Sequence, residues 1–340
     1  MSIIGKSGKS GKSGKSGDTD HAGGEESTHL SYAITTTRDG VVGYWDLTRV
    51  AALTGSFPKS IDYLSPTSRT FLIDKVLFDT VTIAAIGNND GATLTFQNQN
   101  IALHCPQPNT FAKQLSHVKS YADLRDDRLS EILEQTDDLL SFFGALTYLD
   151  DHRQTKRLEL LNATIRFAQH VEMTVKHFSH RHRPIDYAHE VQPIIQTPDH
   201  STFPAGHACE SFAVATVLQH LIDKGTTSDA LTISSKPGHL FFRLAHRIAE
   251  NRIVAGVHFP IDNLSGAVLG IFLGEVVWHV VNGSSFEFNT DFNIGTTFGT
   301  GKKFENPDFT IENILRLLKS GATATFAASA PDDISHFFVT

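Results

Sequence analysis

Apolar residues recur at intervals of three and four positions through the middle of this 340-residue chain, a spacing that predicts helices with one buried face. The pattern covers residues 123–149 and 155–178, and shorter runs cover residues 240–253 and 310–319. We therefore predict helices over these four ranges. In the second range the apolar positions are Leu158, Leu161, Ile165, Ala168 and Val175.

Two further stretches, residues 208–222 and 261–281, are apolar on nearly every side. A helix of that composition is buried in a protein core or lies in a membrane. Residues 264–281 are almost long enough to cross a bilayer, but Glu275 and His279 interrupt them. These two polar residues favour a buried helix in a soluble protein.

The N-terminal part has a different texture. Between residues 32 and 115, prolines and short apolar pieces follow no clear period. The exception is a pair of strand-like runs, residues 80–85 and 92–96, on either side of a Gly-Asn-Asn-Asp-Gly turn. This arrangement predicts a β-hairpin within an otherwise irregular segment.

These patterns predict a mainly α-helical bundle with a small irregular N-terminal part that contains the hairpin. Residues 1–28 begin with four Gly-Lys-Ser repeats and are expected to form a disordered tail. The repeats are not a phosphate-binding loop, because no glycine lies five residues ahead of a Gly-Lys pair and no strand precedes them. Residues 29–115 form the N-terminal subdomain, residues 116–282 the helical core, and residues 283–340 a C-terminal extension packed on that core.

Net charge and cysteine content limit which binding partners and which cellular compartment we expect for this protein. The formal net charge is -8, and without the four lysines of the tail the chain has 25 basic against 37 acidic residues. Such a body repels nucleic acid. Cys105 and Cys209 make no disulfide framework, and nothing at the N-terminus resembles a signal peptide. We therefore predict a soluble, cytoplasmic protein with no nucleic-acid or membrane partner, and leave a homo-oligomer open.

Three short segments concentrate charged and imidazole side chains, and the first of them is Lys176, six residues, then Arg183-Pro184. Lys176 lies in the last turns of the predicted helix over residues 155–178. Pro184 biases Arg183 to an extended conformation, so the arginine can leave the helix and return beside the lysine. A guanidinium fork and an ammonium together suit phosphate-like oxygens. Taken alone, a basic helix end is also explained by the helix dipole.

The second segment, Pro204-Ala205-Gly206-His207, opens the apolar helix over residues 208–222. Free amides at a helix N-terminus favour an anion, and glycine lets the backbone come close to it. His207 is then a candidate general acid. A turn glycine beside a surface histidine is the alternative interpretation.

The third segment contains Asn251-Arg252, then His258, then Asp262. Pro260 is a suitable first helical residue, so Asp262 falls in the first turn of the helix that follows. From there its carboxylate can accept a hydrogen bond from one nitrogen of His258 and leave the other nitrogen as nucleophile or ligand. A simple capping role for Asp262 is the alternative. Together the three segments predict a pocket for one tetrahedral oxyanion.

The order and spacing of these segments resemble the signature of the superfamily that joins type-2 phosphatidic acid phosphatases, bacterial acid phosphatases and vanadium-dependent haloperoxidases. That signature is Lys, six residues, Arg-Pro; then Pro-Ser-Gly-His; then Ser-Arg, five residues, His, three residues, Asp. Ala205 and Asn251 stand where the family has serines, which implies weaker anion binding. The resemblance implies a helical bundle with vanadate or phosphate bound by Lys176, Arg183, Ala205, Gly206, Arg252 and His258, and with His207, His258 and Asp262 as catalytic residues.

The resemblance implies two chemistries. We favour a vanadate-dependent haloperoxidase that oxidises bromide or iodide with hydrogen peroxide, with vanadium bonded to His258 and with His200 near the halide. The alternative is a soluble acid phosphatase that acts on a phosphoester through a phosphohistidine. An inactive oxyanion-binding scaffold is a third hypothesis. Because the sequence lacks several spanning helices, we expect water-soluble substrates. Zinc binding is disfavoured at His177, His180 and His182, which lack ligand spacing.

Overall fold

The computed structural model describes residues 28–42, 60–150, 153–222, 240–300, 303–327 and 332–339. The predicted tail therefore lies outside the described residues, apart from Thr28, which begins helix α1. Helix α1 covers Thr28–Thr37, and a π-helical turn follows at Arg38–Val42.

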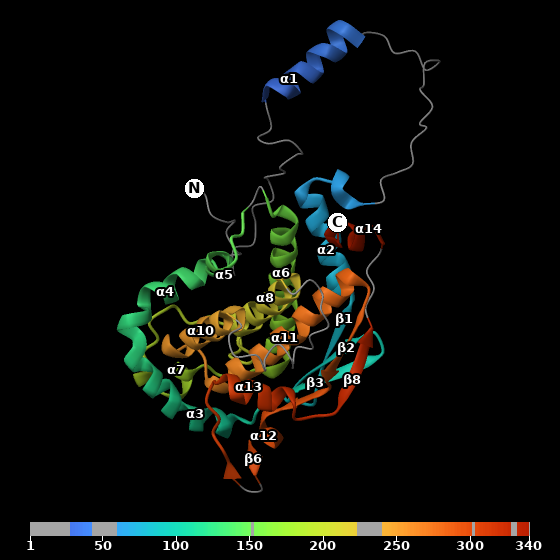
Figure 1. Cartoon of the computed structure of the whole chain (residues 1–340). Helices are drawn as coiled ribbons and strands as arrows, with labels where there is room; N and C mark the ends of the chain where they lie inside the picture. Colours follow the sequence, from blue (N-terminus) through green and yellow to red (C-terminus); the bar gives the residue numbers. More distant parts are fainter. Residues whose placement is uncertain are drawn as a thin grey trace.

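Four long helices form the centre of the molecule, and helix α8 contacts each of the other three. Figure 1 shows this bundle, with α8 and α11 crossing its middle. The prediction of a mainly helical bundle is confirmed. The four helices are α6 (Thr155–Ser179), α8 (Gly206–Ile222), α10 (Leu240–Val254) and α11 (Pro260–Asn282).

Helices α8 and α11 run in the same direction and approach each other closely. Gly266, Gly270 and Gly274 lie at four-residue intervals on α11, where a β-carbon would clash with the backbone of Ala205, Cys209 and Ala213 in turn. The partner positions rise together along the two helices, so both N-termini lie at one end of the pair and both C-termini at the other. This arrangement explains why both helices are apolar nearly all round: each is enclosed by its neighbours.

An arc of shorter helices covers one side of the bundle in Figure 1. A single helix was predicted over residues 123–149, and this was wrong in one respect. The helix is interrupted at Asp138, between α4 and α5. Asp138 is extended there (φ -145°, ψ 117°), and its carboxylate accepts a hydrogen bond from the Ser141 amide at 3.1 Å. The arc consists of α3 (Pro108–Tyr121), a 3-10 turn (Ala122–Leu124), α4 (Arg125–Asp137) and α5 (Leu140–Leu146).

The predicted hairpin is present as β1 (Val81–Ala85) and β2 (Gly91–Phe96), paired antiparallel. Two more strands extend it: β3 (Gln99–His104) pairs antiparallel with β2, and β5 (Asp291–Asn293) pairs in parallel with β3. The N-terminal segment is thus more regular than predicted, and it also contains helix α2 (Pro66–Asp79).

The segment after residue 282 packs on the core through aromatic rings. Strands β4 (Ser285–Asn289) and β8 (Thr323–Ala327) pair antiparallel, and Phe286 and Phe326 lie against Phe272 of α11. Strand β5 of this C-terminal segment also joins the sheet of the N-terminal segment. The two segments therefore share one core. The remaining elements are 3-10 turns at Ile61–Tyr63 and His189–Val191, α7 (Pro184–Tyr187), α12 (Ile294–Thr297), β6 (Gly299–Thr300), β7 (Lys303–Phe304), α13 (Ile311–Leu318) and α14 (Asp332–Val339).

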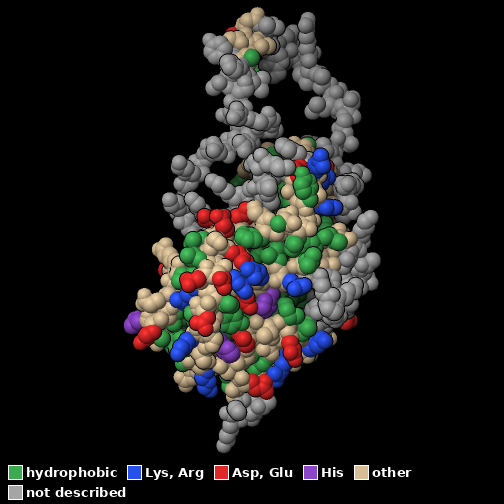
Figure 2. Space-filling view, turned by 60° about the vertical axis from the view of Figure 1, so that its left-hand side comes forward, with side chains coloured by type: hydrophobic (Ala, Val, Ile, Leu, Met, Phe, Trp, Pro, Cys, Tyr) green, Lys and Arg blue, Asp and Glu red, His purple; other side chains and the backbone are tan. Residues whose placement is uncertain are grey.

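The surface shown in Figure 2 carries acidic and basic side chains interspersed over its described part. The cations that sequence analysis singled out do not belong to such a surface. Lys176, Arg183 and Arg252 are each at most 3% exposed. A buried cation needs a partner, so these three side chains define where the chemistry of the molecule lies.

Candidate active site

The first segment turns as the sequence predicts. Helix α6 ends at Ser179, and His180 adopts a left-handed conformation (φ 45°) that reverses the chain. Arg183 is extended (φ -80°, ψ 162°) ahead of Pro184, and its amide donates to the carboxylate of Asp186 at 2.8 Å. The guanidinium thereby leaves the helix and enters the interior.

Arg183 connects the other functional side chains. Its Nη1 donates to Nε2 of His258 at 3.0 Å and to the Val257 carbonyl at 2.9 Å. Its Nη2 lies 3.1 Å from Nδ1 of His200, and its Nε donates to the His200 carbonyl at 3.2 Å. Burial lowers the pKa of Arg183 to about 10, so it remains a cation at neutral pH.

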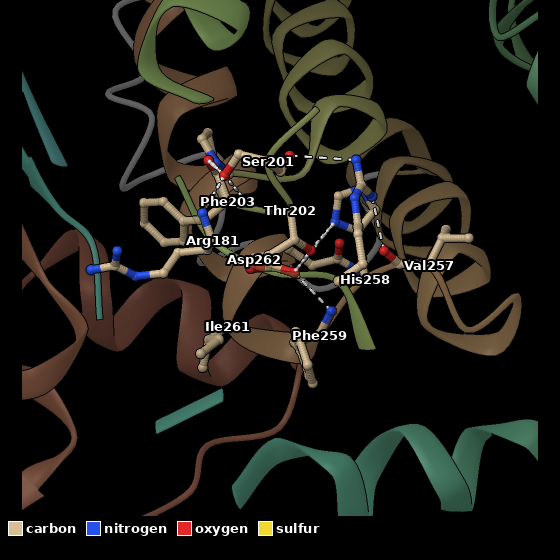
Figure 3. Close-up of polar contacts among 12 residues, drawn as sticks. Arg181, Ser201, Thr202, Phe203, Val257, His258, Phe259, Ile261 and Asp262 are labelled. Atoms are coloured by element: carbon tan, nitrogen blue, oxygen red, sulfur yellow. Dashed lines mark hydrogen bonds and ion pairs between the residues drawn. The ribbon is translucent and has the colours of Figure 1, made fainter. Parts of the chain in front are cut away.

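His258 and Asp262 form the pair that the third segment predicts. Nδ1 of His258 lies 3.3 Å from Oδ2 of Asp262, which also accepts from the Thr202 hydroxyl at 2.6 Å and the Phe259 amide at 2.8 Å. Figure 3 shows Thr202, His258 and Asp262 pointing toward one another. Because Arg183 can only donate, Nε2 of His258 must accept from it and the ring proton lies on Nδ1. Nε2 is therefore the nitrogen with a free electron pair.

Electrostatics keep this histidine neutral. Burial, followed by the charges of Arg183 and Lys176, holds the pKa of His258 well below its ordinary value. Burial also raises the pKa of Asp262 to about 6, against the opposing effect of hydrogen bonds from Thr202 and Phe259. Above pH 6 the pair is thus a neutral imidazole oriented by a carboxylate, which is the state that a nitrogen nucleophile requires.

The second segment meets this pair at the start of α8. The Ala205 amide donates to the Asp262 carbonyl at 3.0 Å, and the Ala205 carbonyl accepts the first helical bond, from Cys209 at 3.1 Å. Ala205 is therefore the N-cap, and the amides of the three residues after it have no acceptor within the helix. A β-carbon at Gly206 would overlap the carboxylate of Glu172, which explains the glycine.

Lys176 lies beside the same helix start. Its ammonium donates to the Pro204 carbonyl and pairs with Oε2 of Glu172 at 3.3 Å. Burial lowers the pKa of Lys176 and raises that of Glu172, and their mutual attraction opposes both shifts. Glu172 was not singled out from the sequence, although its position four residues before Lys176 on a helix is a recognisable signal.

His207 is held by one of its two ring nitrogens. Its Nε2 lies 3.0 Å from the Gln135 carbonyl, which can only accept, so Nε2 carries the proton. Burial and the charge of Arg252 lower the pKa of His207 to about 3. His207 and His200 are only partly buried, so the cluster reaches solvent at these two rings.

Arg252 has nitrogens with no acceptor. Its Nη2 donates to the Ile132 carbonyl and to Oε1 of Gln135, each at 3.1 Å. Its Nε and Nη1 are buried and have no hydrogen-bond partner among the described residues. Burial lowers the pKa of Arg252 to about 10, so the side chain still carries its charge at neutral pH. A buried guanidinium with two unused donors fits an oxyanion, whether phosphate or vanadate.

Several residues of the three segments have other partners. Asn251 bonds Gln135 and Arg128. Arg181, whose guanidinium points away from His258 in Figure 3, donates to the Pro106 and Ser179 carbonyls. The histidines considered for zinc are exposed side chains of the helix end: His177, His180 and His182. Sequence reasoning missed Thr202 and Gln135, for which no spacing rule gives a signal.

Comparisons with known proteins agree with this site. The family model of the PAP2 superfamily matches residues 158–286, the range that contains all three segments. No curated protein sequence matches the chain. The resemblance to the PAP2 superfamily is thus confirmed over residues 158–286, the part of the chain that the family model covers.

Two solved structures resemble the chain at low similarity. The first is described as a crystal structure of Aquifex aeolicus LpxE, with 20% identity, a TM-score of 0.31, and coverage of 64% of this chain and 98% of that one. The second is described as the first transmembrane PAP2-type phosphatidylglycerolphosphate phosphatase from Bacillus subtilis, with 18% identity, a TM-score of 0.29, and coverage of 64% and 86%.

The prediction of a soluble, cytoplasmic protein was wrong. The second matched structure is described as a transmembrane enzyme. Among the described residues, α11 is the one helix long and apolar enough to cross a membrane, and 89% of that apolar stretch is buried inside the protein.

Proposed function

We propose that this protein is a PAP2-type phosphatase that hydrolyses a phosphoester through a phosphohistidine at His258. The observation that carries the proposal is the pair of unused donors on buried Arg252. Arg252 is one of three buried cations, and another of them, Arg183, donates to Nε2 of the neutral His258. Such a group favours a phosphoryl group whose charge increases in the transition state.

In the first half-reaction, Nε2 of His258 attacks phosphorus and the bond from phosphorus to the ester oxygen breaks. Arg183 exchanges its bond to Nε2 for a phosphoryl oxygen. The Nδ1 proton stays on the ring, where Asp262 stabilises the positive charge that develops. Thr202 and the Phe259 amide hold the carboxylate in position for this role.

His207 supplies the proton for the leaving oxygen. Because its Nε2–H is bound to the Gln135 carbonyl, the transferable proton is on Nδ1. The low pKa of His207 in the substrate-free pocket rises when a phosphate anion binds, since the anion offsets the charge of Arg252. In the second half-reaction, Nδ1 takes a proton from water, the hydroxide attacks phosphorus, and the P–N bond breaks to release phosphate and restore His258.

The equatorial oxygens of the phosphoryl group face Lys176, Arg183, Arg252 and the first amides of α8. Ala205 offers no hydroxyl, so this group of donors lacks one hydrogen bond that the family pattern supplies. The three cations and the helix dipole remain to bind the anion.

Haloperoxidase chemistry, our first expectation, has no support from the comparisons. Nδ1 of His200, the residue that favoured it, lies 3.1 Å from Nη2 of Arg183 and 3.2 Å from the Ser201 carbonyl. Burial lowers the pKa of His200 to about 4, with a further contribution from the Lys176 and Arg183 charges. We interpret His200 as a residue that positions Arg183.

The test is to trap the covalent intermediate. Purified protein, freed of phosphate, is incubated with a radiolabelled phosphoester, either a small aryl phosphate or a lipid phosphate in micelles, and quenched in base. We expect an acid-labile, base-stable phosphoprotein that is lost in His258→Ala and kept in His177→Ala, an exposed histidine on α6. Orthovanadate should inhibit competitively. Absence of hydrolysis and phosphohistidine would refute the proposal, and vanadate-dependent halide oxidation in the same preparation would replace it.

A further inference from the structure

A second polar cluster lies at the opposite end of the α8–α11 pair. His220 is in the last turn of α8, and Glu275 and His279 lie one turn apart near the end of α11. Nε2 of His220 is 2.9 Å and Nε2 of His279 is 3.2 Å from the same carboxylate oxygen, Oε2 of Glu275. The three ligand-type atoms lie within 4.8 Å of one another.

These separations are close to those between ligand atoms in a tetrahedral metal site. Bonds of about 2.0–2.2 Å from zinc to nitrogen and oxygen place neighbouring ligand atoms about 3.3–3.5 Å apart. Two imidazoles and one carboxylate are also a donor set that zinc uses in proteins. Slight separation of the three side chains would admit the ion between them.

The cluster has unused polar atoms. Oε1 of Glu275 and Nδ1 of His220 are buried and have no hydrogen-bond partner among the described residues. A structural network of two imidazoles and a carboxylate would be expected to use these atoms. Oε1 can instead serve as a second carboxylate ligand, which gives the unpaired atom a function.

The surroundings hold the rings in the orientation that a ligand needs. Nδ1 of His279 lies 2.6 Å from the Ser284 hydroxyl, which leaves Nε2 directed at Glu275. The ring of His220 stacks on Trp278 with centroids 5.0 Å apart, and that of His279 stacks on Phe286 at 4.8 Å. A hydrogen bond to the second ring nitrogen is a recurrent feature of metal-bound histidine.

Charge at this end of the helices favours a cation. The acidic group of the cluster is Glu275, which presents one carboxylate oxygen to both histidines. Helices α8 and α11 both end here, and the negative ends of their dipoles add to the carboxylate charge.

We propose that His220, Glu275 and His279 bind one divalent transition-metal ion of the zinc class. The ion would bond to Nε2 of each histidine and to the Glu275 carboxylate, and each ring would move its proton to Nδ1, where His279 can donate it to Ser284. Calcium and magnesium are excluded as occupants because two of the three ligands are nitrogen. The side chain of His279 is 14% exposed, against 4% for His220 and 2% for Glu275, so the ion would enter beside His279.

This site is separate from the proposed phosphatase chemistry. His220 lies fourteen positions after Gly206 on α8, which at 1.5 Å per residue corresponds to about 21 Å. The ion would tie the C-terminal ends of two central helices together and would not touch the substrate. Its presence can therefore be measured without an activity assay.

The test is metal binding by the full-length protein after treatment with a chelator. Zinc titration followed by calorimetry, with metal analysis of the dialysed protein, should give one tightly bound zinc per chain, and Co²⁺ should give the visible absorption of a low-coordinate nitrogen–oxygen site. Zinc should raise the unfolding temperature, whereas magnesium should not. Glu275→Gln and His279→Gln should each weaken zinc binding by about 100-fold or more.

The control separates this cluster from the exposed histidines at the end of α6. The double variant His177→Ala, His180→Ala should keep the tight zinc, and His279→Gln, at the solvent edge, provides a second test if Glu275→Gln does not fold. Equal zinc affinity in wild type and in the foldable cluster variants would overturn the proposal. So would the absence of any tight site in the wild-type protein.

Discussion

The two ends of the α8–α11 pair carry polar groups of opposite character. The N-terminal end has three buried cations, Lys176, Arg183 and Arg252. Arg183 bonds the neutral His258, and Arg252 has two donors with no partner among the described residues. At the C-terminal end, two imidazoles surround the buried carboxylate of Glu275, which has an unused acceptor. The first end suits an anion and the second a cation.

The difference follows from the direction of the helices. Because α8 and α11 are parallel and their backbones come close at three glycines, their dipoles reinforce each other at both ends. Free amides and positive potential meet at one end, free carbonyls and negative potential at the other. The same packing that builds the core therefore creates two sites of opposite sign.

The largest effect should come from replacing the nucleophile at the anion end. His258→Ala removes Nε2, and we expect kcat/KM to fall by about 10⁴-fold or more, as for other enzymes that lose a covalent nucleophile. Phosphoester hydrolysis and the yield of phosphoenzyme measure the effect. The unfolding temperature should change little, since Asp262 retains Thr202 and the Phe259 amide.

The same variant sharpens the comparison of the two ends. Zinc binding at His220, Glu275 and His279 should be unchanged in His258→Ala, because these residues are one helix length away. Loss of phosphoester hydrolysis together with loss of zinc binding would mean that the variant is misfolded. Undiminished hydrolysis would show that His258 is not the nucleophile.

Arg252→Met should have the next largest effect, a large loss of activity with little change in stability. Removing charge-assisted bonds to a phosphoryl group costs about 1.5–3 kcal/mol each, so two unused donors correspond to a loss of kcat/KM of about 100-fold or more. Without substrate, a buried cation with unpaired nitrogens is costly, and its replacement by an apolar side chain is often neutral or stabilising. The variant also loses the Nη2 bonds to Ile132 and Gln135, which offsets the gain from removing two unpaired donors. We therefore expect an unfolding temperature close to that of the wild type in phosphate-free buffer.

Arg181→Met is the matched control. This arginine is buried too, but its guanidinium bonds the Pro106 and Ser179 carbonyls. Its loss should lower the unfolding temperature and leave phosphate inhibition nearly unchanged. If both arginine variants destabilised the protein equally, the contrast between an anion-binding and a structural arginine would be wrong.

The pH profile should show the coupling of Asp262 and His207. Catalysis requires Asp262 ionised and His207 protonated, whereas their pKa values in the free pocket are about 6 and about 3. Between these values the ionised fraction of Asp262 rises with pH as fast as the protonated fraction of His207 falls. The product of the two fractions, and with it kcat/KM, therefore stays constant. Above pH 6 only His207 still titrates, so kcat/KM falls about tenfold per pH unit.

Asp262→Asn checks which group causes the break near pH 6. An amide can still accept from the His258 ring but does not titrate, so kcat/KM should keep rising as the pH is lowered through 6. A break that persists unchanged would assign it to the substrate instead.

Sequence patterns predict the bundle well because the central helices are long and strongly apolar. The helices predicted over residues 155–178, 208–222, 240–253 and 261–281 begin and end within two residues of α6, α8, α10 and α11. The failures are local. The break at Asp138 depends on one side chain capping the next helix, and strand β3 is recognisable only once its partner β2 is known.

The site likewise has residues that the sequence predicts and residues that it does not. Lys176, Arg183, His207, Arg252, His258 and Asp262 come from segments whose spacing is meaningful, and the fold brings them to one end of α8 and α11. Gln135 accepts hydrogen bonds from both Arg252 and His207 but lies 72 positions from the nearer of them. The zinc-type cluster was also missed, because Glu275 and His279 were considered only as interruptions of an apolar helix. Their partner His220 lies 55 positions away from Glu275, and only the parallel packing brings them together.

The smallest expected effect is a gain, from Ala205→Ser, which restores the hydroxyl of the family pattern at the anion end. One added hydrogen bond to a charged oxygen is worth about 1.5 kcal/mol at the lower end, so phosphate should bind about tenfold more tightly. The inhibition constant for phosphate, with kcat/KM beside it, measures this.

Ala205 is also the N-cap of α8, and a serine there can instead accept from an amide of the first turn and stabilise the helix by about 0.5–2 kcal/mol. A higher unfolding temperature with unchanged phosphate affinity would mean that the hydroxyl caps the helix and that the N-terminal end binds its anion through the cations alone.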